Sequence, residues 1–96
     1  MPTYIGLLNY TDKGIQAVKD APTRIDRARE AFRAAGGELK AVYLTMGQYD
    51  VVTIGEAPDD ATVARVTLAI AGQGNIRSQT MRAFTESEVK SIVSGL

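Results

Sequence analysis

The sequence contains no cysteine and no histidine. Without cysteine, the protein can form no disulfide, use no thiolate nucleophile and hold no cysteine-ligated cluster. Without histidine, it lacks the commonest general base near neutral pH, the commonest zinc ligand and the usual proximal haem ligand. Any catalysis must therefore use Tyr, Asp, Glu, Lys or Arg, or an imported cofactor. We expect no metal and no cofactor.

A net charge and a long apolar run are also missing. The 11 basic and 11 acidic residues cancel, which removes the long-range attraction to phosphate on which non-specific nucleic-acid binding depends. The chain begins Met-Pro-Thr-Tyr, without a basic region leading into an apolar segment, and no apolar run reaches the ~18 residues of a membrane span. We expect a soluble cytoplasmic protein with neither nucleic acid nor membrane as a partner.

The 96 residues are close to the usual size of one domain. No Ser/Pro-rich segment or charge run divides them, so residues 1–96 are interpreted as a single domain. A domain of this size buries only roughly 60 to 65% of the surface that its unfolded chain exposes, so its core is thin. Oligomerisation would be a natural source of extra burial.

The first third of the chain predicts a strand followed by a broken helix. Residues 3–10 (TYIGLLNY) are rich in Tyr, Ile and Leu, which suits a strand. Thr11 or Asp12 can cap a helix, and residues 13–20 have helical spacing. Pro22 interrupts that helix because residues before proline avoid the α region. A second helical segment begins at Thr23 and ends at a Gly-Gly signal after an apolar stripe, formed by Ile25, Ala28, Phe32 and Ala35.

A hairpin and a second helix follow. Residues 38–46 (ELKAVYLTM) and 49–56 (YDVVTIGE) are β-branched or aromatic, with little more than Gly47-Gln48 between them. Pro58 suits the first turn of a helix that runs to about Ala71, and the acids that follow it suit the positive end of the helix dipole.

The last quarter predicts a fourth strand and a terminal helix. Residues 76–84 (IRSQTMRAF) are strand-like. Thr85 and Glu88 have the spacing of a capping box. The helix behind them has one apolar face, formed by Val89, Ile92, Val93 and Leu96.

This order, β-α-β-β-α-β with a terminal helix, predicts an α+β, ferredoxin-like fold with a four-stranded antiparallel sheet. Two helices should cover one face of that sheet. Alternation along residues 3–10, 38–46 and 49–56 nevertheless places large apolar side chains on both faces, and a sheet of this kind needs a second cover. A partner subunit or the terminal helix could supply it, and we favour a homodimer packed sheet to sheet, of the dimeric α/β-barrel type.

Tyr49 and Asp50 are the candidate catalytic residues. In the structural interpretation, Asp50 accepts a backbone hydrogen bond and fixes the hairpin. In the chemical interpretation, the two side chains project from opposite faces of the sheet, and Asp50 acts as a base or binds a polar substrate group. The polar-tipped side chains that a sheet-face pocket could recruit as ligand-binding groups are Tyr10, Tyr43, Tyr49, Arg77 and Arg82. Arginine in a partly apolar pocket would imply an anionic ligand.

Three other motifs have structural explanations. The GQGN segment, residues 72–75, follows a helix and precedes a strand, which is the wrong order for a phosphate loop and suits a helix end and turn. The arginines of residues 24–33 alternate with acids at helical spacing, as on a solvated helix surface. Asp59 and Asp60 are explained by a helix N-terminus rather than by a metal.

The segment GQYDVV, with NYTDKGIQAVKDAP before the hairpin and EAPDD and TMRAF after it, resembles the GYD-domain family. These small bacterial and archaeal proteins are named after a Gly-x-Tyr-Asp-like signature, here Gly47-Gln48-Tyr49-Asp50. The similarity covers nearly the whole chain. It implies a ferredoxin-like fold and a dimeric α/β-barrel arrangement, and it implies no particular activity.

Three classes of function are compatible with these features. The leading hypothesis is a cofactor-free protein that binds a small molecule as a homodimer or larger oligomer. The second is a cofactor-independent enzyme, similar to a monooxygenase or isomerase, acting on a small apolar or aromatic metabolite; this rests on fold analogy alone. The third is a structural or regulatory assembly module without a small ligand.

Overall fold

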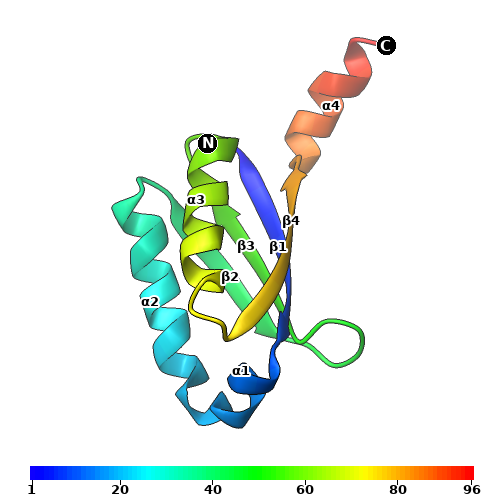
Figure 1. Ribbon diagram of the computed structural model, residues 1–96. Helices are drawn as coiled ribbons and strands as arrows, with labels where there is room; N and C mark the ends of the chain where they lie inside the picture. The colour runs from blue at the N-terminus through cyan, green and yellow to red at the C-terminus, as the bar shows by residue number, and fades with distance from the viewer.

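A computed structural model describes all 96 residues (Figure 1). The elements follow in the order β1 (Thr3–Tyr10), α1 (Asp12–Gln16), the 3-10 turn η1 (Val18–Asp20), α2 (Ala21–Ala34), β2 (Glu38–Leu44), β3 (Val51–Glu56), α3 (Asp60–Ala71), β4 (Ile76–Ala83) and α4 (Glu86–Ser94). None of the helices combines the length and the apolar character needed to cross a membrane.

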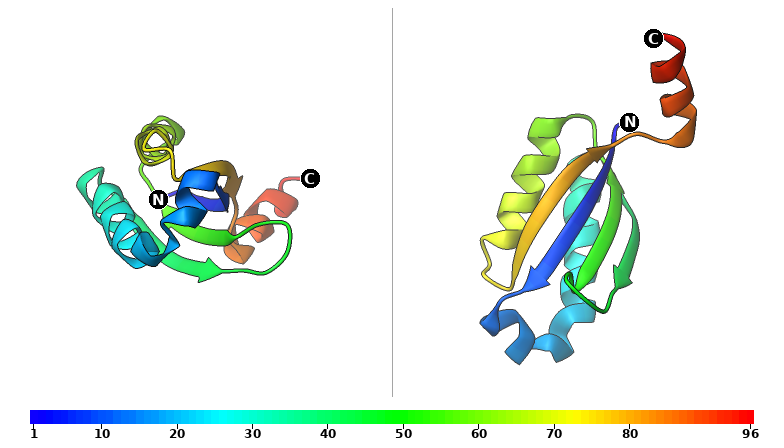
Figure 2. Two further views of the ribbon diagram at one scale, coloured as in Figure 1. Left: turned by 60° about the horizontal axis from the view of Figure 1, so that its bottom comes forward. Right: turned by 90° about the vertical axis from the view of Figure 1, so that its right-hand side faces the viewer.

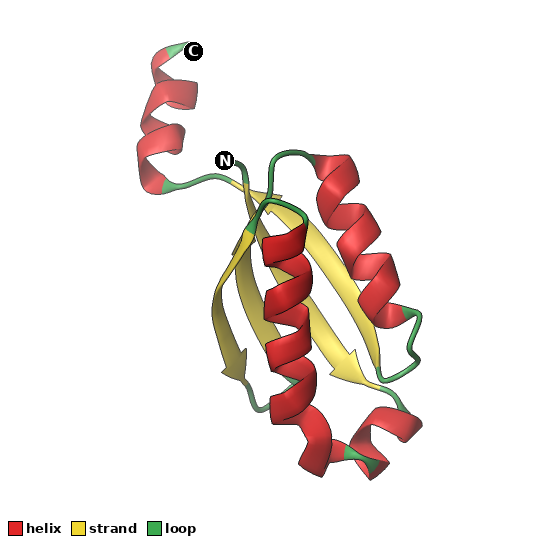
Figure 3. Cartoon of the chain, turned by 90° about the vertical axis from the view of Figure 1, so that its left-hand side faces the viewer, coloured by secondary structure: helices red, strands yellow, loops and turns green.

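The four strands form one antiparallel sheet in the order β2-β3-β1-β4. The first strand in sequence therefore lies in the middle, between β3 and β4, and the two strands of the hairpin are neighbours. Helices α2 and α3 lie side by side over one face (Figure 3). This arrangement confirms the predicted ferredoxin-like α+β fold.

The helical region after β1 is broken, as the sequence predicts, but the break lies earlier than Pro22. The side chain of Thr11 caps α1 by accepting a hydrogen bond from the backbone N–H of Gly14. Helix α1 ends at Gln16, and α2 begins at Ala21, so that Pro22 lies in its first turn. Proline is tolerated there because the first turn needs no N–H donor within the helix. The prediction that the proline interrupts the helix was therefore wrong.

The hairpin strands are each two residues shorter than predicted. β2 ends at Leu44 and β3 begins at Val51, which leaves a six-residue loop, residues 45–50. Gly47 has φ = 124°, a conformation that side chains with a Cβ rarely adopt. The loop projects from the same end of the sheet as α1 (Figure 1).

Two helix starts follow from capping residues. Asp59 is the N-cap of α3, since its carboxylate accepts a hydrogen bond from the N–H of Thr62 at 2.8 Å. Pro58 therefore precedes the cap, and the prediction that it lies in the first turn of this helix was wrong. The capping box of α4 is confirmed, because Thr85 and Glu88 exchange side-chain to backbone hydrogen bonds.

The core is thin and lies on the helix-covered face. Only nine of the 96 residues are buried, and the largest are Tyr4, Leu39, Val51, Val63 and Val66. They come from β1, β2, β3 and α3, with the half-buried ring of Phe32 from α2 packed against them. The molecule is correspondingly flat, with extents of 48 × 31 × 17 Å.

The opposite face of the sheet is open. Helix α4 does not cover it: α4 leaves the end of β4 and extends beyond the sheet, on the side away from α2 and α3 (Figure 2). The terminal helix therefore does not provide the second cover within the same chain.

Candidate functional site: the hairpin loop and the two faces of the sheet

Four hydrogen bonds fix the base of the hairpin loop. The Asp50 carboxylate accepts the backbone N–H of Tyr10 at 2.9 Å, and the Asp50 N–H donates to the carbonyl of Leu8 at 2.9 Å. The Thr45 N–H donates to the carbonyl of Asp50 at 2.8 Å, and the Thr45 hydroxyl donates to the carbonyl of Tyr49 at 2.5 Å. Asp50 therefore holds the loop against the end of β1. This geometry agrees with the structural interpretation, in which Asp50 accepts a backbone hydrogen bond and fixes the hairpin.

Two large apolar side chains are exposed at the start of this loop, one on the last residue of β2 and one in the loop itself. Leu44 is 77% exposed and Met46 is 98% exposed, while the Tyr49 hydroxyl beyond them donates to the side-chain carbonyl of Gln79 at 3.0 Å. Exposed methionines suit adaptable binding surfaces because the side chain is flexible and polarisable. Sequence reasoning did not select these two residues. The available signal was a methionine placed directly before Gly47, at the point where the chain turns.

A cavity of about 160 Å³ lies on the helix-covered face, between the sheet, α2 and α3. Most of its lining is apolar, contributed by residues that include Leu8, Ile25, Ala28, Val42, Ile70 and Ile76. Its polar groups are Tyr10, Arg24, Arg27, Thr53, Gln73 and Asn75. The Arg24 guanidinium already donates to the carbonyls of Ala17 at 3.0 Å and Gly14 at 3.4 Å. The mainly apolar lining suits a small, mainly apolar molecule.

The structure distributes the predicted ligand-binding residues over three places. Tyr10 lines the cavity. Tyr43 and Arg77 lie on the open face. Their register partners, Val52 and Asn9, alternate along the strands with residues that face the helices. The Tyr49 hydroxyl reaches Gln79 on the same open face. Arg82 pairs with Tyr4 at the other end of the sheet.

These five residues therefore do not meet in one pocket. The candidate base, Asp50, lines neither of the two main cavities.

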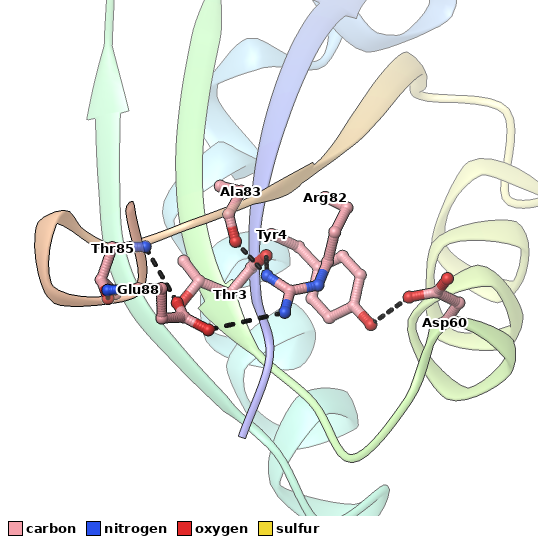
Figure 4. Close-up of polar contacts among 7 residues, drawn as sticks. All are labelled: Thr3, Tyr4, Asp60, Arg82, Ala83, Thr85 and Glu88. Carbon is pink, nitrogen blue, oxygen red and sulfur yellow. Dashed lines mark hydrogen bonds and ion pairs between the residues drawn. The ribbon is translucent and has the colours of Figure 1, made fainter. Parts of the chain in front are cut away.

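Arg82 belongs to a polar and aromatic cluster at the far end of the sheet from the hairpin loop (Figure 4). Its guanidinium lies 4.4 Å from the ring centre of Phe84 and 5.9 Å from that of Tyr4. It pairs with the Glu88 carboxylate at 3.7 Å and donates to the carbonyls of Thr3 and Ala83. These contacts connect β1 and β4 to the start of α4.

The Tyr4 hydroxyl of this cluster donates to the Asp60 carboxylate at 2.5 Å. Burial, followed by the hydrogen bond and the negative charge of Asp60, raises the pKa of Tyr4 to about 12. Tyr4 is only 4% exposed, so its hydroxyl serves the packing of β1 against α3. Hydrogen bonds from Thr85 lower the pKa of Glu88, which keeps that carboxylate charged beside Arg82.

No three acidic side chains are grouped so that they could hold a metal ion. The candidate functional features are thus an anchored loop with an apolar tip, an open apolar sheet face and an apolar cavity. All three belong to one ferredoxin-like α+β domain.

Comparison with known proteins assigns that domain. The chain belongs to the GYD domain family, whose model matches residues 4–93. A protein of Thermus thermophilus named "Glutamine synthetase and cystathionine beta-lyase binding protein" is 37% identical over 90 residues, covering 93% of this chain and 95% of the relative.

Two solved structures are similar in fold. A feast or famine regulatory protein from M. tuberculosis, complexed with L-methionine, superposes with a TM-score of 0.67 at 14% identity. The match covers 88% of this chain and 51% of the regulator, so the present chain spans about half the length of that protein. A Thermus thermophilus protein superposes with a TM-score of 0.56 at 23% identity, covering 88% of this chain and 95% of that one.

Proposed function

We propose that this protein is a non-catalytic, homodimeric binding protein that docks on enzymes of amino-acid metabolism through its hairpin loop. The observation that carries the proposal is the loop itself. Its base is held by four hydrogen bonds, while Met46 in the loop and Leu44 at the end of β2 are exposed to solvent. A rigidly held apolar tip loses little conformational entropy on binding, and it can fill a pocket on a partner surface.

The likeness to the Thermus relative supports the choice of partner. That protein is named for binding glutamine synthetase and cystathionine beta-lyase, and the identity extends over nearly the full length of both chains. We therefore propose the corresponding two enzymes of the source organism as partners.

The homodimer is proposed from the open face. Leu7, Val52 and Ile54 lie there half-buried, and Tyr43 and Met81 are more exposed. A surface of this kind on a chain with so few buried residues gains free energy when a second copy covers it.

Catalysis is not part of the proposal. Asp50 is the candidate base, but its carboxylate accepts the N–H of Tyr10 and lies outside the main cavities. The position of Asp50 therefore does not support the alternative in which this residue acts as a catalytic base.

Binding of each enzyme to the immobilised protein can be measured by biolayer interferometry. Met46→Asp places a charge at the loop tip and is expected to weaken binding at least tenfold. Leu68→Asp is the matched control, since Leu68 is 72% exposed on α3, and it should bind like the wild type. Equal binding by both variants, or no binding of either enzyme by the wild type, would contradict the proposal.

A small apolar ligand in the cavity is a second candidate function, favoured by the apolar lining between α2 and α3. Native mass spectrometry of freshly purified protein should then show a defined extra mass. Ala28→Leu fills the cavity and should remove that mass, whereas Ala64→Leu, at an exposed position of α3, should retain it. Absence of extra mass on the wild type, or its retention in Ala28→Leu, would contradict a ligand at this place.

A further inference from the structure

The apolar face of α4 is uncovered. Val89, Ile92 and Val93 lie on one face of the helix and are 45%, 51% and 56% exposed, and Leu96, just beyond the helix end, is 98% exposed. The helix extends past the sheet on the side of the open face (Figure 2). An isolated helix of nine residues is marginal in water, and most helical stability comes from packing an apolar face.

The start of α4 is nevertheless held in place. Arg82 stacks on Phe84 and pairs with Glu88, and the capping box fixes the first turn. These contacts tie the helix to the end of β4, so it is oriented rather than loosely attached. A helix that is capped, oriented and left with a bare apolar face is suited to pack against a surface outside its own chain.

A sheet-to-sheet contact alone offers a limited flat area. Four strands spaced by ~4.8 Å and about seven residues long cover roughly 19 × 23 Å, or ~440 Å². A stable interface buries about 800 Å² on each partner. A helix of nine residues presents a strip of roughly 13 × 10 Å, or ~130 Å². If each copy both offers its own α4 and receives that of the other, the exchange adds about twice that area to the contact between the copies.

We infer that α4 is exchanged between two copies, its apolar face packing on the second copy at the edge of the paired sheets. The inference rests on the homodimer proposed above and is independent of enzyme binding. The zero formal net charge of the chain does not oppose association of two copies. A membrane surface is a poorer occupant, because α4 carries Glu86 and Glu88 against a single Lys90.

Amide hydrogen exchange in α4 directly tests whether this helix packs on the second copy. The wild type is measured above and below the dimer dissociation constant, which sedimentation equilibrium determines separately. We expect the amides of residues 89–94 to exchange at least tenfold more slowly in the dimer than in the monomer. Unprotected α4 amides in a dimer would overturn the inference and leave the homodimer standing. Equal protection in monomer and dimer would show packing within one chain and would overturn it too.

A pair of variants gives an independent readout. Ile92→Asp places a charge in the apolar face, and Ser91→Asp places the same charge one position outside it. Both residues are exposed, so both variants should fold. We expect Ile92→Asp to raise the dimer dissociation constant at least tenfold and Ser91→Asp to change it less than twofold. Equal constants for the two variants would contradict the exchange. A wild type that stays monomeric would overturn this inference and the proposed homodimer together, while enzyme binding is scored separately.

Discussion

The two faces of the sheet have similar amino acids and different surroundings. On the helix-covered face Tyr4 is 4% exposed and Leu39 is 6% exposed, and α2 and α3 pack above them. On the open face Tyr43 is 58% exposed and Met81 is 44% exposed, and no element of the same chain lies above them. Apolar composition alone therefore does not tell which face forms the core, since that depends on which elements cover it.

This difference divides the chain into parts with separate tasks. The helix-covered face carries the buried residues and so the stability of the isolated chain. The open face, the hairpin loop and α4 leave their apolar groups accessible. Variants that remove the same atoms from each part can test this division.

Leu39→Ala should have the largest effect on the isolated chain. Removing a buried leucine deletes apolar contacts and leaves a cavity, at a cost of about 3 kcal/mol. Leu7→Ala makes the same change on the open face, where the side chain is only half-buried, and should cost about 1 kcal/mol in the monomer. Urea denaturation at a concentration that keeps the chain monomeric measures both values.

Repeating that measurement at a concentration that favours the dimer sharpens the comparison. The cost of Leu7→Ala should then rise, because the second copy buries the side chain, while the cost of Leu39→Ala should not change. Equal costs for the two variants in the monomer would mean that the open face contributes as much to the core as the covered face.

Most of the fold could be predicted because local signals and periodicity agree. Thr85 and Glu88 define the start of α4, and alternation along residues 3–10 defines β1. Errors arose where one residue fits two roles. Pro22 can end a helix or open one, and only the preceding η1 turn makes it the opening of α2.

The candidate site was harder to predict because its residues meet through the register of distant strands. Nothing local distinguishes Arg82, which faces Tyr4 at one end of the sheet, from Arg77, which lies on the open face. Asp50 was selected as a candidate catalytic residue with a structural alternative, and its hydrogen bond agrees with that alternative; its partner, the N–H of Tyr10, lies 40 residues away in sequence. Leu44 and Met46 were missed because solvent exposure is a property of the folded chain.

Asp50→Ala should destabilise the monomer by about 2 kcal/mol, since it removes the charged acceptor of a backbone N–H at the end of β1. Asp50→Asn keeps an acceptor oxygen and should cost about 1 kcal/mol or less. Thermal and urea unfolding measure both. Neither variant should abolish dimerisation. Unchanged stability of Asp50→Ala together with loss of ligand or enzyme binding would refute the structural role and favour the chemical one.

The N-caps of α3 and α4 can be removed in turn, and the expected losses of stability are smaller than those above. Asp59 caps α3, which packs on the sheet, so Asp59→Ala should lower the free energy of unfolding by about 1 kcal/mol. Thr85 caps α4, which extends away from the sheet, so Thr85→Ala should leave the unfolding of the monomer unchanged. Urea denaturation of the monomer gives both values. An equal loss in the two variants would indicate that α4 packs on its own sheet.

Tyr4→Phe should change the pH dependence of the free energy of unfolding at high pH, and this change separates the covered face from the open face. Because the pKa of Tyr4 is raised from 10.0 to about 12, the folded chain retains a proton that the unfolded chain releases between these values. The free energy of unfolding therefore falls as pH rises from 10 to 12, and the contribution is fully present below pH 10. Tyr4→Phe should lose less stability over this interval than the wild type. Tyr43→Phe, which removes an exposed hydroxyl from the open face, should follow the wild type. Parallel curves for all three proteins would mean that the pKa of Tyr4 is not raised in the folded chain.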